Sequence, residues 1–465
     1  MIDRKAVARD DDLLDSEAGA GPTRERERGR ERREEIMSAR AAASGPESGP
    51  VPADGASDEA LADGFDLRRV GADFLENPYP TYHALRRRAP VHRCPDGSLF
   101  LTRWADLNRV YRDHEAFSSD KTVEFRPKYG DSPLYRHHTT SLVFNDPPRH
   151  TRVRRLLAPA FTPRALALLE ARFVELVDGL LDRAEAQGGM DVVTDYAASL
   201  PVQIIGDMLG IPEAERGPLR DWSLAILGAL EPVPSAAALD WGNRSVAEFS
   251  DYLAGHVARY RRGALGAGGE VLGLLVDGEL EGPDGPERLS DEELVQNCIF
   301  LLNAGHETTT NLIGNGIAAL LEHPEALARL RGEPDLIASA VEEFLRYESS
   351  NQLGNRRAVR DSEIGGIAVP AGTLVTLCIG AANRDPEQFP DPDRLDLARR
   401  PNRHLAFGGG IHACAGMTLA RLEGRIAIGR LLARVPAFHR SAPFRRGGRA
   451  RFRGFLSYPV SFGEG

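Results

Sequence analysis

A glycine-rich turn with a single cysteine is the stretch of this sequence whose residue types are best suited to chemistry. It runs from Phe407 to Gly416 as Phe-Gly-Gly-Gly-Ile-His-Ala-Cys-Ala-Gly, and a helical pattern begins at Met417. Consecutive glycines let a backbone turn sharply and approach a flat ligand without a Cβ in the way. Cys414 stands just ahead of the helix, where unpaired N–H groups and the helix dipole favour thiolate over thiol. The turn is typical of an iron-binding thiolate, and the alternative is a buried neutral cysteine in a simple glycine turn.

A long helix is predicted about a hundred residues earlier. Ser290 and Glu293 form a capping box, and the helical pattern continues until Pro324. About 32 residues at 1.5 Å each would make a helix of roughly 48 Å. Its middle, from Ala304 to Thr310, reads Ala-Gly-His-Glu-Thr-Thr-Thr. Glycine and threonine are poor helix formers, and a threonine hydroxyl can bond the carbonyl four residues back, so we expect a distortion here.

Such a distortion would present an acid and an alcohol, Glu307 and Thr308, to a pocket as a proton relay. The alternative is a locally weak helix with a surface Glu-Thr pair.

Another candidate helix follows Asp146, which can cap it, and carries prolines in its first turn. His150 and Arg154 are four residues apart and share one face. A His/Arg pair suits the buried carboxylates of a cofactor, which need donors, and the alternative is a basic solvated helix. Arg149, Arg152 and Arg155 point elsewhere and form a basic patch on an acidic protein.

The cysteine turn resembles the haem-binding loop of the cytochrome P-450 family, the haem-thiolate monooxygenases, and Ala-Gly-x-Glu-Thr resembles the family's oxygen-activation motif. The resemblance implies haem b with a cysteine thiolate as iron ligand, Cys414, and Glu307 and Thr308 as catalytic residues. The cofactor-binding residues it implies are His150, Arg154, Ala304, Arg356, Phe407, Gly408, His412, Cys414 and Gly416. Arg356 has an arginine beside it, Arg357, so its assignment depends on register. The resemblance also implies a structural group of Glu343, Arg346 and Arg394.

The fold implied is mainly α, with a smaller β-rich region and haem between the long helix and the cysteine loop. The reaction implied is insertion of one atom of O2 into an organic small molecule, by hydroxylation or epoxidation. No dinucleotide fingerprint follows a strand, so electrons from NAD(P)H would arrive through a ferredoxin and a ferredoxin reductase. The alternatives are a peroxide-driven haem-thiolate enzyme and a non-catalytic haem-binding protein.

The composition of the chain limits the classes of partner and compartment to be expected. The 465 residues carry a net charge of -10, which gives no indication of a nucleic-acid partner. The apolar runs are far shorter than the roughly 20 residues that span a bilayer, so no membrane anchor is expected. The four cysteines lack paired metal-ligand spacings and the N-terminus is charged, which favours a reduced, cytoplasmic protein.

Residues 1–64 differ from the rest in composition, because they combine an Arg/Glu run with an Ala/Gly/Ser/Pro stretch. We expect them to be a disordered extension, with Met37 as a possible true start, and residues 65–465 to form one domain. The domain should open as helix, strand hairpin and helix. Residues 121–145 lack periodicity and are expected to form a loop over the pocket.

Overall fold

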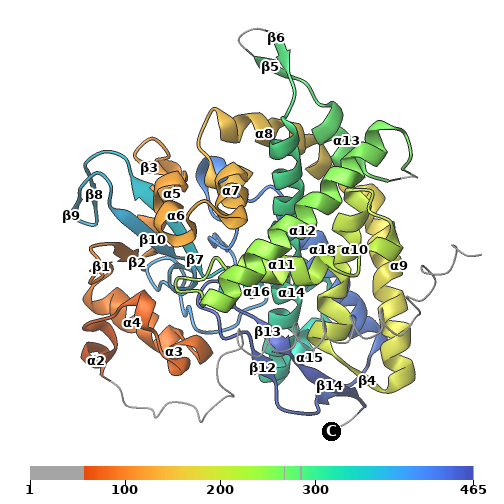
Figure 1. Ribbon diagram of the computed structural model, residues 1–465. Coiled ribbons are helices and arrows are strands. Elements are labelled where there is room, and N and C mark those ends of the chain that lie inside the picture. The colour runs from red at the N-terminus through yellow and green to blue at the C-terminus, as the bar shows by residue number, and fades with distance from the viewer. Residues whose placement is uncertain (1–56, 266–267, 283–284, 464–465) are drawn as a thin grey trace, which may run out of the picture. The chain divides into compact units, whose positions relative to one another are not determined.

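The structure is a computed structural model that describes residues 57–463 except 266–267 and 283–284. Within it, helix α14 (Asp291–Glu322) passes through the interior, as Figure 1 shows. Its 32 residues begin at the predicted capping box, where the Ser290 hydroxyl accepts from the Glu293 N–H (3.2 Å) and Glu293 accepts from the Ser290 N–H (3.0 Å). The predicted length and both predicted ends are confirmed.

The other helices surround α14 or cover the sheet. They are α2 (Asp58–Ala62), α3 (Ala72–Glu76), α4 (Tyr79–Arg88), α5 (Trp104–Arg112), α6 (Thr122–Tyr129), α7 (Pro133–Thr140), α8 (Arg149–Leu157), α9 (Pro163–Gln187), α10 (Ser199–Met208), α11 (Leu219–Gly228), α12 (Ala236–Arg261), α13 (Glu270–Asp277), α15 (Pro324–Gly332), α16 (Ile337–Tyr347), α17 (Ile379–Ala382) and α18 (Met417–Arg434). A π-helical turn, η4 (Val192–Ala197), precedes α10, and a 3-10 turn, η7 (Gly410–His412), precedes α18.

The strands are short. They are β1 (Val91–Arg93), β2 (Leu99–Leu101), β3 (Phe117–Ser118), β4 (Gly189–Asp191), β5 (Leu280–Gly282), β6 (Gly285–Glu287), β7 (Leu353–Ala358), β8 (Ser362–Ile364), β9 (Ile367–Val369), β10 (Leu374–Cys378), β11 (Phe438–Arg440), β12 (Arg445–Arg446), β13 (Phe455–Ser457) and β14 (Pro459–Phe462).

One five-stranded sheet, in the order β1-β2-β10-β7-β3, forms the main β region. The predicted opening of helix, hairpin and helix is confirmed, since α4, the antiparallel pair β1-β2 and α5 follow one another. Strand β10 runs parallel to β2 and antiparallel to β7, with Val375 opposite Arg356. This sheet therefore joins the start of the domain to the chain that follows α16, and it fixes the position of Arg356.

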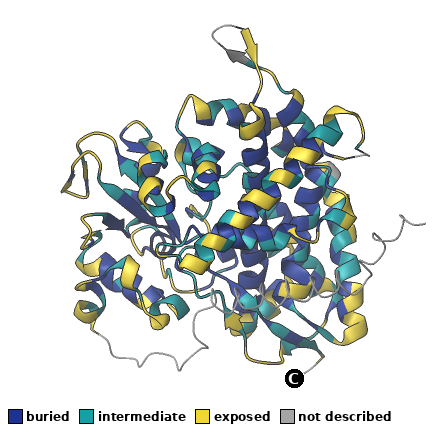
Figure 2. Cartoon of the chain, in the orientation of Figure 1, coloured by how far each residue is buried: buried dark blue, intermediate teal, exposed yellow. Residues whose placement is uncertain are grey.

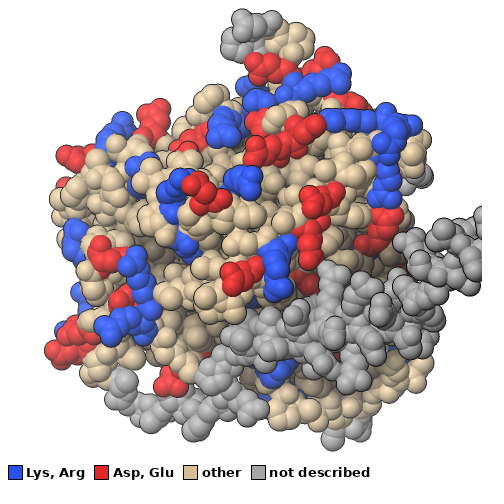
Figure 3. All heavy atoms as spheres, viewed as in Figure 1, with Lys and Arg blue, Asp and Glu red and all other residues tan. Residues whose placement is uncertain are grey.

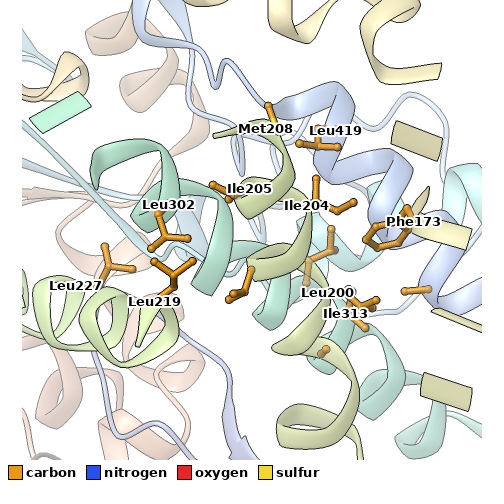
Figure 4. Close-up of a cluster of buried hydrophobic side chains, with 14 of the residues drawn as sticks. Phe173, Leu200, Ile204, Ile205, Met208, Leu219, Leu227, Leu302, Ile313 and Leu419 are labelled. Carbon is orange, nitrogen blue, oxygen red and sulfur yellow. The ribbon is translucent and has the colours of Figure 1, made fainter. Parts of the chain in front are cut away.

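Helix α10 lies in the hydrophobic core between α14 and the neighbouring helices. Figure 4 shows its apolar side chains among those of α9, α11, α14 and α18. The labelled residues there are Phe173, Leu200, Ile204, Ile205, Met208, Leu219, Leu227, Leu302, Ile313 and Leu419. Figure 2 shows buried residues along α14, whereas α12 alternates exposed and buried residues. The core thus holds α14 from several sides, which compensates for its weak central sequence.

Two expectations about local structure were wrong. Residues 304–310 remain α-helical, so α14 continues without a break through the threonine-rich stretch. Residues 121–145 hold the helices α6 and α7 rather than an irregular loop. Their sequence lacks a regular apolar stripe, but Ser132 caps α7 and the rings of Phe125 and Tyr129 are buried. Tertiary burial decides their structure.

The expected extension, residues 1–64, lies mostly outside the described residues, and so does Met37. Within its last part, α2 is helical, and Ala62 is buried in a cluster with Phe65, Tyr82 and Leu85. None of the helices that the structure describes is long and apolar enough to cross a membrane.

Candidate active site

The cysteine turn forms a tight loop whose shape requires glycine. Gly408 and Gly410 both have φ of 65°, a left-handed conformation that side chains disfavour. A Cβ on Gly410 would lie 2.0 Å from the Tyr111 carbonyl oxygen, so the loop also packs too closely for another residue. The Cys414 N–H donates to the Phe407 carbonyl (2.9 Å) and closes the loop. The glycines therefore hold Cys414 in a fixed position at the wall of the main cavity.

The surroundings of Cys414 act on its thiol in opposite directions. Burial raises the pKa of this thiol, and the Gly416 N–H and the charges of Arg154 and Arg421 only partly oppose that effect. A metal ion bound to the sulfur would remove the proton outright.

Helix α8 contributes donors beside the cysteine loop. Arg154 Nη2 donates to the Ala413 carbonyl (2.8 Å), which ties α8 to the loop. The rings of His150 and His412 lie 4.1 Å apart between centroids. Both ring nitrogens of His150 and the Nε2 of His412 are buried without a hydrogen-bond partner in the described part of the chain. Burial and the neighbouring charges of His412 and Arg154 lower the pKa of His150 to about 4.

Asp146 was expected to cap α8, but it serves another purpose. Its carboxylate accepts from the Ser119 N–H (2.9 Å) and from the Ser118 hydroxyl, at the end of β3. Helix α8 begins at Arg149, directly after the pair of prolines that follow Asp146, so Pro148 occupies the cap position. The same carboxylate lies 3.9 Å from His412 Nε2, too far for a hydrogen bond.

Strand β7 places Arg356 at the cavity, and the neighbouring Arg357 is not among the residues that line it. The Arg356 guanidinium lies over the Tyr111 ring (5.2 Å to the centroid), and its Nη1 donates to the Asn355 carbonyl (2.7 Å). Phe407, Gly408 and Gly416 also line the cavity.

The middle of α14 contributes Ala304 and Thr308 to the same cavity. The Thr308 hydroxyl donates to the Ala304 carbonyl (2.6 Å), which is the expected bond to the residue four back. Gly305 also lines the cavity, and a Cβ there would lie 2.4 Å from Cδ1 of Ile205 on α10. Glycine thus allows α10 to pack tightly against this stretch of α14.

Glu307 does not face the main cavity. It is 7% exposed and lies at a second, smaller cavity of about 40 Å³, where its carboxylate accepts from Arg449 Nη1 at 2.7 and 2.9 Å. Burial raises the pKa of Glu307, and the charge of Arg449 opposes this. The expected acid and alcohol therefore line different cavities on different faces of α14, since consecutive helical residues point about 100° apart.

The predicted structural group needs one correction. Glu343 and Arg346 form a fully buried pair, with Arg346 Nη2 and Nε each 2.8 Å from a carboxylate oxygen. The third arginine is Arg399, whose Nε lies 3.1 and 3.2 Å from the Glu343 oxygens. Arg394 is exposed and offers only its carbonyl, which accepts from Arg346 (3.1 Å) and Arg399 (3.1 Å). The loop after α17 turns the Arg394 side chain to solvent and brings Arg399 back to the pair.

Sequence reasoning missed three charged residues that line the cavity. Glu423 is 3% exposed on α18, and burial raises its pKa to about 8, although the Thr309 hydroxyl opposes this. A carboxylate on the apolar face of a predicted helix could have signalled it. Lys121 and Arg451 also line the cavity. The sequence has an arginine at every second position from Arg449 to Arg453. In an extended segment this spacing puts the three side chains on one face, which is a signal for inward-facing cations.

The main cavity has a volume of about 350 Å³. The predicted residues of the cysteine loop and those of the long helix meet at this cavity. Cys414 and its loop lie on its wall with the α8 residues and Arg356, and Ala304 and Thr308 lie on its wall from α14. Apolar side chains make up much of the remainder, including Leu142, Phe144, Leu227, Leu301 and Ile379.

These residues fit a haem. The buried ring nitrogens of His150 and His412 lack partners, as carboxylate-binding groups would before their ligand is present. Arg154 and Arg356 add cationic donors at the same cavity, and Cys414 supplies a sulfur ligand. Two propionates and an iron are the groups that this set of donors would satisfy.

Comparison with known proteins agrees with this interpretation. Residues 270–436 match the model of the family described as cytochrome P450. The chain is 40% identical over 367 residues to a vitamin D(3) 25-hydroxylase of Pseudonocardia autotrophica, covering 78% of this chain and 87% of that protein. It is 41% identical over 378 residues to the cytochrome P450 monooxygenase PikC of Streptomyces venezuelae, covering 80% and 87%.

Solved structures show the same fold. The structure of P450BioI in complex with hexadec-9Z-enoic acid ligated acyl carrier protein matches with a TM-score of 0.78 at 35% identity, covering 84% of this chain and all (100%) of that one. The structure of CalO2 matches with a TM-score of 0.79 at 35% identity, covering 86% and 99%. The chain therefore belongs to the cytochrome P450 family, whose monooxygenases hold haem b through a cysteine thiolate.

Proposed function

We propose that the protein inserts one atom of O2 into an organic small molecule bound in the main cavity, by hydroxylation or epoxidation. We further propose that NAD(P)H supplies the electrons through a ferredoxin and its reductase. One observation carries this proposal. Cys414 of the glycine-rich loop and Thr308 of α14 line one cavity whose other walls are largely apolar. The names of the relatives record different molecules, vitamin D(3) in one and, in another, a complex with acyl carrier protein that carries hexadec-9Z-enoic acid.

In this proposal Cys414 is the iron ligand, and His150, Arg154, Arg356 and His412 bind the propionates. When bound, the haem supplies reductive activation of O2, and a thiolate ligand favours cleavage of the O–O bond. The protein's own residues orient the cofactor, exclude water and control protons.

Two residues of α14 would control protons. Thr308 Oγ1 gives its hydrogen to the Ala304 carbonyl, so its lone pairs can accept a hydrogen bond from a water in the cavity. Glu307 would receive solvent protons at the smaller cavity, which can hold water beside Arg449 and His306. A proton would have to pass around α14 from one cavity to the other.

The test combines a spectrum with a reconstituted assay. The reduced, carbonyl-bound protein should show the red-shifted Soret band of thiolate-ligated haem, and Cys414→Ala should lose that band. Cys378→Ala is the matched control, because that buried cysteine does not line the cavity.

Turnover should then need NAD(P)H, ferredoxin and reductase together. A Cys414→Ala protein that keeps the red-shifted band would contradict the ligand assignment. Product formed with hydrogen peroxide alone, and none with the reductive system, would favour the peroxide-driven alternative. Haem binding with no product under either condition would favour a non-catalytic role.

A further inference from the structure

The charges on the wall of the main cavity are unbalanced. Among the residues that the structure describes, four cationic side chains line it, and they are Lys121, Arg154, Arg356 and Arg451. Glu423 is the one carboxylate among the described lining residues. An ionised group in an apolar wall is costly unless a partner compensates its charge. Each of the four cations therefore needs a group that compensates its charge.

Three of these cations have partners. Arg154 and Arg356 belong to the set proposed for the haem propionates. Lys121 Nζ donates to the Glu124 carboxylate (2.6 Å), and the Lys121 side chain is 3% exposed. That leaves Arg451.

The Arg451 guanidinium is bound by neutral oxygens. Its Nε donates to the Leu230 carbonyl (3.2 Å), its Nη1 to the Leu353 carbonyl (2.8 Å) and its Nη2 to the Asn355 side-chain oxygen. No carboxylate in the described part of the chain forms an ion pair with this guanidinium. A guanidinium has five N–H donors, so two remain for another acceptor.

The surroundings of Arg451 hold it in place at the cavity. The three acceptor residues, Leu230, Leu353 and Asn355, line the same cavity. Glu231 fixes the backbone instead, because its carboxylate accepts from the N–H groups of Ala450 (2.9 Å) and Arg451 (3.1 Å). A guanidinium held on three sides loses little further freedom when it binds a ligand, which favours affinity.

Two further polar groups at the cavity lack partners. The Ser119 hydroxyl and the His138 Nε2 are buried without a hydrogen bond in the described residues, and both residues line the cavity. Burial, with the charges of His137, Lys128 and Arg451, holds the pKa of His138 well below its usual range. The charge of Arg451 therefore acts on this wall of the cavity.

We propose that Arg451 binds a carboxylate carried by an otherwise apolar substrate. This inference rests on the proposed function, in which the same cavity receives the substrate. A carboxylate would use the two free N–H donors and compensate the unpaired charge, while Leu142, Phe144 and Leu227 contact the apolar body. The substrate class is thus a carboxylic acid with a hydrocarbon body, rather than a neutral hydrocarbon or alcohol.

A haem propionate is also a carboxylate, so the experiment must separate the two sources. The probes are dodecanoic acid, hexadecanoic acid and 5β-cholanic acid, each with its methyl ester, titrated into the haem-loaded protein. Binding is followed by the change of the haem from low to high spin and by equilibrium dialysis. At least one acid should bind about tenfold or more tighter than its ester, as expected for a hydrogen bond between charged groups.

Arg451→Gln should abolish that preference and leave haem content unchanged. Arg451→Lys should keep part of the preference, because it retains the charge but loses the fork of donors. Arg136→Gln is the matched control: it removes an exposed arginine from α7 that does not line the cavity, and it should change nothing.

Four results would overturn the inference. They are equal binding of acid and ester for all three pairs, no binding of any acid, a preference that survives in Arg451→Gln, and loss of haem from Arg451→Gln, which would assign Arg451 to a propionate. The comparison of acid with ester in the parent protein needs no variant, so it decides even if both variants misfold. Because spin state and dialysis require no turnover, a failed monooxygenase assay leaves this test intact, and an active enzyme without acid preference would refute this inference alone.

Discussion

The Thr308 hydroxyl lies at the surface of the main cavity, on the same wall as Ala304, and its hydrogen is engaged by the Ala304 carbonyl. Its neighbour Glu307 is held by Arg449 in a separate cavity. The two side chains therefore act in different places, and a change at one leaves the contacts of the other intact. This separation lets their roles be tested one at a time.

Thr308→Ala should leave haem content and substrate binding unchanged but uncouple electron use from product formation. Without the hydroxyl, a water at this wall loses a fixed partner, and reducing equivalents should leave as hydrogen peroxide. Product formed per NAD(P)H consumed should fall about tenfold or more, since a positioned proton-transfer group contributes about 10²-fold or more. The measurement is of NAD(P)H, peroxide and product in one reconstituted assay.

Thr139→Ala is the control for that experiment. Thr139 lies on α7 and its hydroxyl also bonds the carbonyl four residues back, that of Tyr135 (2.8 Å), but it lines neither cavity. If both variants couple electrons to product as the parent does, Thr308 has no part in proton control.

Glu423 makes a second prediction at this scale, because burial raises its pKa from 4.5 to about 8. Between these values the folded protein holds a proton that the unfolded chain releases, so the free energy of unfolding should fall as pH rises through this window. At about 1.4 kcal/mol per pKa unit, the loss between pH 5 and pH 8 is up to about 4 kcal/mol. Glu423→Gln should remove it.

Urea unfolding of parent and Glu423→Gln at pH 5, 6, 7 and 8 measures this difference. Glu170→Gln, an exposed glutamate of α9, is the control and should keep the slope of the parent. Parallel pH profiles for the parent and Glu423→Gln would show that Glu423 is ionised in the folded protein.

At the scale of elements, the loop between α17 and α18 is held by the buried Glu343 carboxylate. That carboxylate accepts from Arg346 and Arg399, from the Asp396 N–H (2.9 Å) and from Asn402 Nδ2 (3.0 Å). It joins α16 to the chain that leads into the cysteine loop. The position of Cys414 thus depends on an ion-pair network some distance from it.

Arg399→Gln should destabilise the protein by about 3 kcal/mol, because it leaves part of a fully buried charge uncompensated. Arg394→Gln should change the free energy of unfolding by no more than about 0.5 kcal/mol, as expected of an exposed side chain. Chemical unfolding of the two variants compares them directly. Equal losses, or a larger loss for Arg394→Gln, would contradict the assignment of Arg399 as the third arginine.

The elements that the sequence predicted well are those with local signals. Ser290, Glu293 and Pro324 mark both ends of α14. Helices α6 and α7 lack a regular apolar stripe in their sequences. Their buried side chains pack against helices that are distant in the sequence. Their structure could not be predicted from local pattern.

The site was predictable only in part, for a geometric reason. A loop with Gly410 and Cys414 has its own local shape, so its place at the cavity followed from its residues. The direction of Glu307 depends on which side of α14 faces the cavity, and that is set by α10 and α11 packing. Arg449 and Arg451 lie more than 30 residues after Cys414, and only the folded chain brings them to α14 and β7.

At the scale of the whole molecule, the protein is acidic but carries a local group of basic side chains on one helix. The chain carries -10 overall, and Figure 3 shows basic and acidic side chains interspersed over the face in view. Helix α8, by contrast, has basic residues outside the cavity, with Arg149 and Arg155 exposed. Arg152 is partly compensated, because it lies 3.0 Å from Glu293. Since Arg154 ties α8 to the cysteine loop, these cations belong to a helix that contacts that loop.

This arrangement predicts that an acidic electron donor docks over α8. Exposed charges steer an oppositely charged partner, and salt screens them over about 10 Å at 0.1 M ionic strength. Arg149→Glu with Arg155→Glu should therefore raise the concentration of ferredoxin needed for half-maximal rate by about tenfold or more, and the parent rate should fall between 0.05 and 0.5 M salt. The charge-reversed protein should lose most of that salt dependence. Arg136→Glu with Arg244→Glu reverses two exposed arginines on α7 and α12, so it tests whether position rather than total charge matters. The carbonyl-bound spectrum should be the same in all variants, because none of these four arginines lines the cavity. If the α8 reversal leaves both the ferredoxin requirement and the salt dependence unchanged, electrons enter elsewhere, and a partner of different charge must be sought.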